Sequence, residues 1–188
     1  MNVDYFAVIH RFISPDSRTY RIYVPHAACV TRKALVAAAR LGLSDEQKRF
    51  IEEAAMLHDI GIVRVDAPDI GCTGDLPYLA HIEEGGKMLR ELGLDRHARV
   101  AERHIGAGVA AADVEAQGLP LPVRDFLPET LEERLISWAD LFYGKHPGEL
   151  WAARSTQAVW SKLAQHGKRH VETFEMWQAR FGGDDDRV

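Results

Sequence analysis

A histidine–aspartate pair within residues 57–61 carries the sharpest chemical signal in the sequence. His58 follows Ala54 by four residues and Ile51 by seven, which places it on the inward face of a predicted helix. Asp59 lies about 100° further round the same helix end. A buried histidine beside a buried aspartate is costly unless both are satisfied, and a metal ion satisfies both. For an isolated pair, a hydrogen-bonded core histidine and a loop-capping aspartate are the commoner arrangement.

The pair is not isolated, because four further polar residues lie on or near the apolar stripes of other predicted helices. They are His26, His81, His104 and Asp140. Six such groups converging in a helical core have the right chemistry for two metal ions, and helices hold ligands rigidly enough for metal geometry. The spacing favours this site without establishing that the helices meet at one point.

The elements that must position these residues are helices. The periodicity of apolar residues predicts helices over residues 27–41, 44–61, 81–92, 95–105, 108–117, 129–143, 148–166 and 168–180. Ser44 and Gln47 have capping-box spacing at the start of the second of these helices. Residues 20–24 resemble a short strand with no convincing partner. Residues 62–79 are predicted to be a loop that forms a lid or a rim over the site.

The predicted fold class is therefore all-α. A length of 188 residues indicates one domain, expected over residues 1–181, with a core at about 20–145 and C-terminal helices at 148–181. Residues 182–188 are expected to be a disordered tail. The C-terminal helices either pack on the core or form the face of a homodimer.

Composition excludes several classes of protein. With 46% hydrophobic residues, 27% charged residues and a net charge of −5, the chain is neither disordered nor suited to coating a nucleic-acid polymer. It has no apolar run long enough to span a membrane and no signal-peptide pattern, so a cytoplasmic location is expected. Its two cysteines do not form a disulfide framework. We expect Cys29 to lie in the core and Cys72 to be accessible in the loop.

The ordered set of histidines and aspartates resembles the HD-domain superfamily of metal-dependent phosphohydrolases. The segment His58-Asp59-Ile60-Gly61 matches its HDIG variant. The resemblance extends to residues 25–35, 55–61, 102–108 and 131–140, which look like a poorly characterised bacterial and archaeal branch. It covers about residues 20–145.

The resemblance implies a helical bundle around a central metal site. His26, His58, Asp59 and Asp140 would hold a first divalent metal ion. His81 and His104 would hold a second, with Asp59 bridging the two. Branches without the two middle histidines use one metal. The metals that suit such ligands are iron, manganese, zinc, cobalt and nickel.

The resemblance also implies hydrolysis of a phosphomonoester or nucleotide phosphate bond by a metal-activated hydroxide, with Asp59 as a catalytic residue. Relatives often have a lysine directly after the last aspartate, where this chain has Leu141. Another cation would then neutralise the phosphate of a small phosphorylated substrate. The candidates are Arg103, which adjoins His104, Lys33, which lies seven residues after His26 on the same helix face, and Lys145, which follows shortly after Asp140. Most such side chains are simply solvated.

Two other functions remain open on the sequence. The same fold and a similar ligand set occur in di-iron oxygenases, which cleave C–H, C–C or C–P bonds. The chain could also be a regulatory module that binds a metal or nucleotide without turnover. Fold alone does not separate these chemistries. His97 is expected to be exposed or to support a ligand, since it lies seven residues from His104 on the same face.

Overall fold

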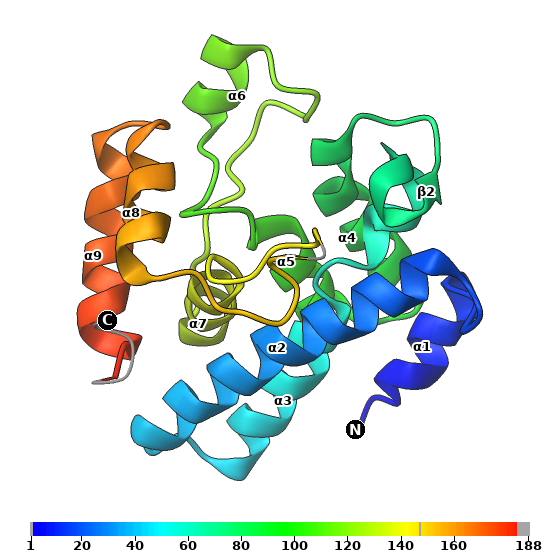
Figure 1. The fold of residues 1–188 in the computed structure, drawn as a ribbon, viewed down its shortest axis with the longest axis horizontal. Helices are drawn as coiled ribbons and strands as arrows, with labels where there is room; N and C mark the ends of the chain where they lie inside the picture. Colours follow the sequence, from blue (N-terminus) through cyan, green and yellow to red (C-terminus); the bar gives the residue numbers. More distant parts are fainter. Residues whose placement is uncertain (1, 147, 184–188) are drawn as a thin grey trace.

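A computed structural model describes residues 2–146 and 148–183 and confirms the all-α class. The helices surround a central region into which several of their ends point (Figure 1). Their bounds are α1 Tyr5–Phe12, α2 Arg18–Arg40, α3 Asp45–Leu57, α4 His81–Glu91, α5 Asp95–Arg103, α6 Ala111–Gln117, α7 Leu131–Asp140, α8 Thr156–Ala164 and α9 Lys168–Phe181. No helix in the described part of the chain is long and apolar enough to cross a membrane.

The connection between α3 and α4 forms a compact rim that is built of short 3₁₀ helices and two short strands. It contains the 3₁₀ helices η1 Ile60–Arg64, η2 Pro68–Ile70 and η3 Tyr78–Ala80. Strands β1 Asp66–Ala67 and β2 Cys72–Thr73 pair antiparallel, with Asp66 opposite Thr73. The loop that the sequence predicted at 62–79 is thus tied to itself by backbone hydrogen bonds.

Helix boundaries follow local signals where those signals are strong. Ser44 accepts a hydrogen bond from the backbone nitrogen of Gln47 and starts α3 with a capping box, as predicted. Thr130 and Glu133 form a second capping box at the start of α7. Because each cap satisfies donors that the first helical turn leaves unpaired, these starts are well defined.

Two sequence expectations about the elements are wrong, and one helix was missed. Helix α1 was not predicted. Residues 20–24 are helical rather than extended, because α2 begins at Arg18 and runs through Pro25. Tertiary packing of Ile22, Tyr23 and His26, all buried on one side, outweighs the local signals there. Residues 148–155 are not helical, and α8 starts only at Thr156.

The core lies in two main clusters, one packed on the second half of α2 and the other on its first half. One joins α2, α3 and α7 to the C-terminal helices and contains Trp138, Phe174 and Phe181. The other joins α1, α2, η1, α4 and α5 and also contains Leu150 from the segment after α7. The buried apolar residues of α8 and α9 therefore pack against other helices of the same chain. The predicted tail falls largely beyond the last described residue.

Gly61 marks the closest approach between the end of the histidine–aspartate segment and α4. A Cβ on this buried residue would overlap the carbonyl oxygen of His81 and the backbone nitrogen of Gly85. Backbone atoms cannot yield as flexible side chains do, so only glycine fits at this position.

We predict that Gly61→Ala destabilises the protein by about 3 kcal/mol, because α4 must move away from η1. Urea unfolding followed by circular dichroism measures the change. Gly148→Ala is the matched control, since a Cβ there meets no atom within 4 Å. Equal midpoints for the two variants would contradict the close-packing argument.

Candidate metal centre

The six predicted ligands come together, and most of them do so at helix ends. His58 and His104 are the C-caps of α3 and α5, and Asp140 is the last residue of α7. His81 is the first residue of α4, and His26 lies inside α2. Three helix C-termini therefore meet here, and each carries a partial negative charge that favours a cation.

The first group of ligand atoms surrounds a single point. His26 Nε2 lies 3.1 Å from Asp140 Oδ1, 3.2 Å from Asp59 Oδ2 and 3.4 Å from His58 Nε2. His58 Nε2 lies 3.2 Å from Asp59 Oδ2 and 3.5 Å from Asp140 Oδ1. Ligands that each stand about 2.1 Å from one ion are roughly 3.0–3.4 Å apart at octahedral or tetrahedral angles. These spacings suit one transition-metal ion.

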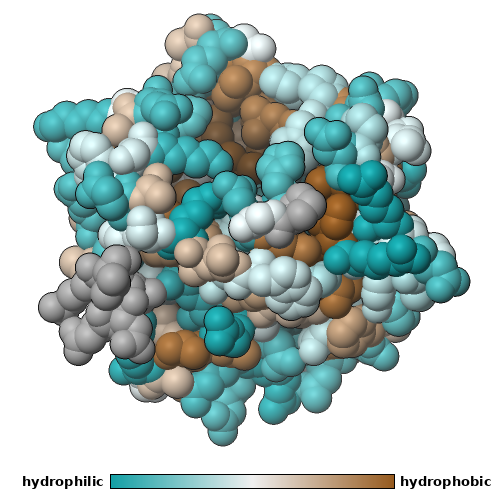
Figure 2. All heavy atoms as spheres, viewed as in Figure 1, coloured by the Kyte–Doolittle hydropathy of each residue, from teal (hydrophilic) through white to brown (hydrophobic). Residues whose placement is uncertain are grey.

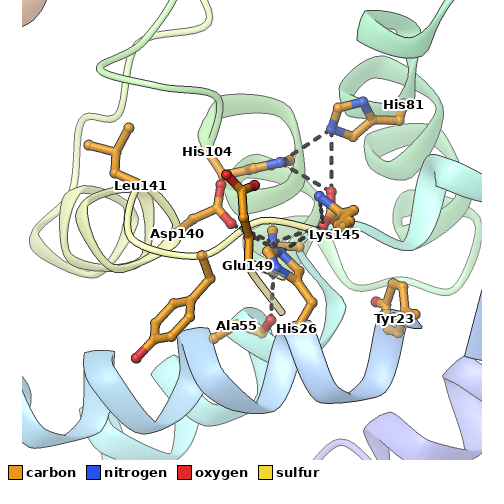
Figure 3. Close-up of polar contacts among 12 residues, drawn as sticks. Tyr23, His26, Ala55, His81, His104, Asp140, Leu141, Lys145 and Glu149 are labelled. Atoms are coloured by element: carbon orange, nitrogen blue, oxygen red, sulfur yellow. Dashed lines mark hydrogen bonds and ion pairs between the residues drawn. The ribbon is translucent and has the colours of Figure 1, made fainter. Parts of the chain in front are cut away.

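A second group of atoms has the same spacing on the other side of Asp59. His81 Nε2 lies 3.3 Å from His104 Nε2 and 3.4 Å from Asp59 Oδ1. His104 Nε2 lies 3.5 Å from the same oxygen. Each oxygen of the Asp59 carboxylate thus faces a different pair of imidazoles. Figure 3 shows His26, His81, His104 and Asp140 directed at this common centre.

The outer nitrogens of three imidazoles fix which nitrogen faces the centre. Nδ1 of His58, His81 and His104 lies 2.6, 2.5 and 2.9 Å from the carbonyl oxygens of Ala55, Tyr78 and Ala101 respectively. A carbonyl oxygen can only accept, so each Nδ1 donates its hydrogen. Each Nε2 then directs a lone pair inward, which is the state that a metal requires.

The carboxylates of Asp59 and Asp140 favour their ionised form, and their negative charge favours a bound cation. Although burial opposes ionisation, Lys145 and His58 hold the pKa of Asp59 well below its usual range. The pKa of Asp140 is lowered in the same way by His26 and His58. Burial disfavours an imidazolium at His58, yet the two carboxylates raise its pKa to about 10.

The remaining polar atoms also fit a metal. Burial lowers the pKa of His81 to about 3, so this ring is neutral and able to coordinate. Asp59 Oδ1 and Asp140 Oδ1 are buried without a hydrogen-bond donor. Buried polar atoms are rarely left unsatisfied, and a metal ion would satisfy both. The residues present therefore fit the divalent metal that the sequence predicted.

Lys145 is the predicted cation that the structure places at this centre. Its Nζ lies 2.6 Å from Asp59 Oδ2, and only 13% of its side chain is exposed. It projects from the irregular segment after α7, which Arg154 fastens by donating to the carbonyl oxygens of Leu141 and Tyr143. Leu150 anchors the same segment in the core.

The other two predicted cations point elsewhere. Lys33 Nζ lies 3.9 Å from the ring centre of Phe142 and 4.7 Å from that of Trp138. Arg103 pairs with Glu129 at 2.8 Å and donates to the carbonyl oxygen of Leu127. Sharing a helix face with a ligand or adjoining one in sequence therefore did not bring either cation into the centre.

Three further expectations have definite outcomes. The expectation that His97 is exposed or supports a ligand is wrong, because His97 is buried in the packing between α3 and α5 and lies 3.2 Å from Glu53 Oε2. Cys29 is buried, as expected. The expectation that Cys72 is accessible is wrong, because its thiol is buried 3.9 Å from Thr19 Oγ1.

A cleft of about 770 Å³ opens directly onto the centre. His104, Asp140 and Lys145 form part of its wall. Ala67 and Ile70 of the rim line another part, so the connection between α3 and α4 borders the cleft. Of the six predicted ligand residues, His104 and Asp140 line the cleft, so a small molecule that enters from solvent can reach this edge of the centre.

Comparison with known proteins identifies related sequences. An uncharacterized protein of Methanocaldococcus jannaschii is 43% identical over 91 residues, which are 47% of this chain and 46% of that protein. The tRNA (cytidine(56)-2'-O)-methyltransferases of Picrophilus torridus and Thermoplasma volcanium are 37% and 36% identical over 94 and 96 residues. These segments are half of this chain but 24% and 25% of the two enzymes. The chain thus spans less than half the length of the relatives it matches.

The family comparison agrees with the arrangement of the ligands. The model of the HD domain matches residues 23–143, a stretch that contains all six ligand residues. The chain belongs to the HD domain family.

Proposed function

We propose that this protein is a metal-dependent phosphohydrolase that cleaves the phosphate from a small phosphomonoester. One observation carries the proposal. The carboxylate of Asp59 faces two separate sets of imidazoles, and the ammonium of Lys145 lies beside it at the mouth of a cleft. This arrangement combines a place for two cations with a side chain suited to an anionic substrate.

The donor set supports two divalent ions. His26, His58, Asp59 and Asp140 would hold one, and His81, His104 and Asp59 the other. When bound, such a pair of ions lowers the pKa of water and stabilises charge on the phosphoryl oxygens.

The chain's own residues would then bind and orient the substrate. Lys145 would hold a phosphoryl oxygen, because its Nζ is the ammonium nearest Asp59 among the described residues. The backbone carbonyls behind His58, His81 and His104 keep the imidazoles from rotating. In the reaction, the oxygen of water bonds to phosphorus, the ester P–O bond breaks, and the alcohol leaves with a proton from the water.

We predict that the purified protein binds about two divalent ions per chain and that Asp59→Asn loses most of them, because both groups of ligands share this carboxylate. Phosphate release should fall by more than about 100-fold, since even outer partners of a ligand are worth 10–100-fold. Elemental analysis after dialysis and a phosphate-release assay with Mn²⁺ measure the two effects. Asp45→Asn, which changes an exposed aspartate, is the control.

A second ligand variant tests the number of metals separately. His81→Gln should retain about one ion per chain, because it alters only the group on the far side of Asp59. Two irons per wild-type chain without release of phosphate would contradict the hydrolase and favour an oxygenase. Absence of bound metal under all loading conditions would reject the centre itself.

We predict that Lys145→Met lowers kcat/KM for phosphomonoesters by about 100-fold, which is the usual loss when one group that stabilises a developing oxyanion is removed. Bound metal should stay at the wild-type level, because the substitution removes a cation rather than a ligand. Steady-state kinetics and elemental analysis on the same preparation provide the measurement.

Lys33→Met is the matched control, because it removes the predicted cation that lies against Phe142 instead of the centre. We expect its kcat/KM to match the wild type. If Lys33→Met were the impaired variant and Lys145→Met were fully active, the assignment of the phosphate-binding cation would be wrong.

A further inference from the structure

The cleft is much larger than a phosphate group requires. Its volume of about 770 Å³ lies within the range of sites that enclose whole drug-sized ligands, about 300–1,000 Å³. The metal ligands occupy only part of its wall, and the remainder extends to α6 and α8. The unfilled part must therefore receive the organic portion of the substrate.

That remainder is mainly apolar. Its wall draws on the loop after α5, the turn after α6, the end of α7 and one face of α8. The apolar residues are Ile105, Ala107, Val109, Leu119, Leu141, Val159 and Leu163. Figure 2 shows hydrophobic residues gathered in a hollow between α6 and the middle of the molecule, with hydrophilic residues around it.

Two carboxylates along this wall, Asp113 and Glu149, are each paired with an arginine. Asp113 pairs with Arg169 at 2.5 Å and accepts from the backbone nitrogen of Ala110. Glu149 pairs with Arg154, also at 2.5 Å. Such pairs satisfy their own charges, so they offer little to the additional phosphates of a nucleoside di- or triphosphate.

The basic side chains at the other end of the cleft are exposed to water. Lys162 lies near the end of α8 and His166 just beyond it, and both are solvent-exposed. Exposed charges contribute little binding energy in water. Selectivity therefore rests on the buried and half-buried apolar side chains between this end and Lys145.

We infer that the preferred substrate is a phosphomonoester of a bulky apolar alcohol, with its phosphate at Lys145 and its hydrocarbon part between α6 and α8. This inference rests on the proposed function and specifies its substrate class. Apolar surface removed from water drives binding, and each buried methylene adds to it.

Two alkyl phosphates of different length test the inference directly. With Mn²⁺-loaded protein, kcat/KM for n-hexyl phosphate should exceed that for ethyl phosphate at least tenfold, and it should also exceed that for AMP and ATP. Calorimetry with hexylphosphonate and ethylphosphonate, which are not hydrolysed, gives a readout independent of turnover. Hexylphosphonate should bind at least tenfold more tightly and with a more negative heat-capacity change.

A pair of leucine variants locates the effect. Leu119→Gln places a polar group in the apolar wall and should reduce the hexyl-to-ethyl ratio at least threefold in both assays. Leu35→Gln changes a half-buried leucine of α2 that does not line the cleft and should leave the ratio unchanged. Because a ratio is measured within each variant, partial loss of folded protein does not alter the comparison.

The outcomes separate this inference from the proposed function. Hydrolysis of all esters with equal kcat/KM, or a preference for AMP or ATP, would overturn the apolar substrate class and leave the hydrolase standing. Tight binding of hexylphosphonate that depends on Leu119, without hydrolysis of any ester, would support the apolar ligand and reject the reaction.

Discussion

The fold depends on the need to balance two carboxylates held out of water. Asp59 is fully buried, and Asp140 lies at the base of the same site. Unpaired charges in such a place are strongly unfavourable, and three helix C-termini add further negative potential. In the structure, the ammonium of Lys145 supplies positive charge beside Asp59. A divalent ion meets the same demand more fully, because it also satisfies the carboxylate oxygens that have no donor.

This constraint explains why the ligands lie at helix ends. A residue at the end of a helix can reach a point shared with other helices, and its backbone still belongs to a rigid element. The last turns of α3 and α5 also provide the carbonyl oxygens that orient His58 and His104. Close contact at Gly61 brings the start of α4, and with it His81, to the same point. Packing and ligand orientation therefore depend on the same few turns of backbone.

Some features of this structure could be predicted from the sequence, because they leave a periodic pattern of apolar residues. Others could not, because they depend on tertiary contacts. The six predicted ligands could be singled out because each is a polar residue on or beside an apolar stripe, which periodicity detects, and the structure brings them together. The sequence could not show which of the three candidate cations lies at the centre. Lys145 comes from an irregular segment whose path depends on Arg154 and Leu150. Helical spacing wrongly favoured Lys33, whose ammonium packs against an aromatic ring. The start of α2 was missed because burial outweighs a local proline.

The residues that carry the proposed reaction and the proposed substrate preference lie both within the matched family region and beyond it. The match to the HD domain covers residues 23–143 and includes all six predicted metal ligands and the cleft residues Leu119 and Leu141. Lys145 lies just beyond it, as do Val159 and Leu163 in the far wall of the cleft. Under the proposed function, a metal centre of this kind would polarise any phosphate ester it receives, so discrimination would depend on the surfaces that hold the alcohol. Val159 and Leu163 of α8 line the cleft and also belong to the core, so a substitution at either residue would alter the cleft and the packing of the C-terminal helices together. Membership of the family therefore constrains the chemistry of this protein more tightly than its substrate.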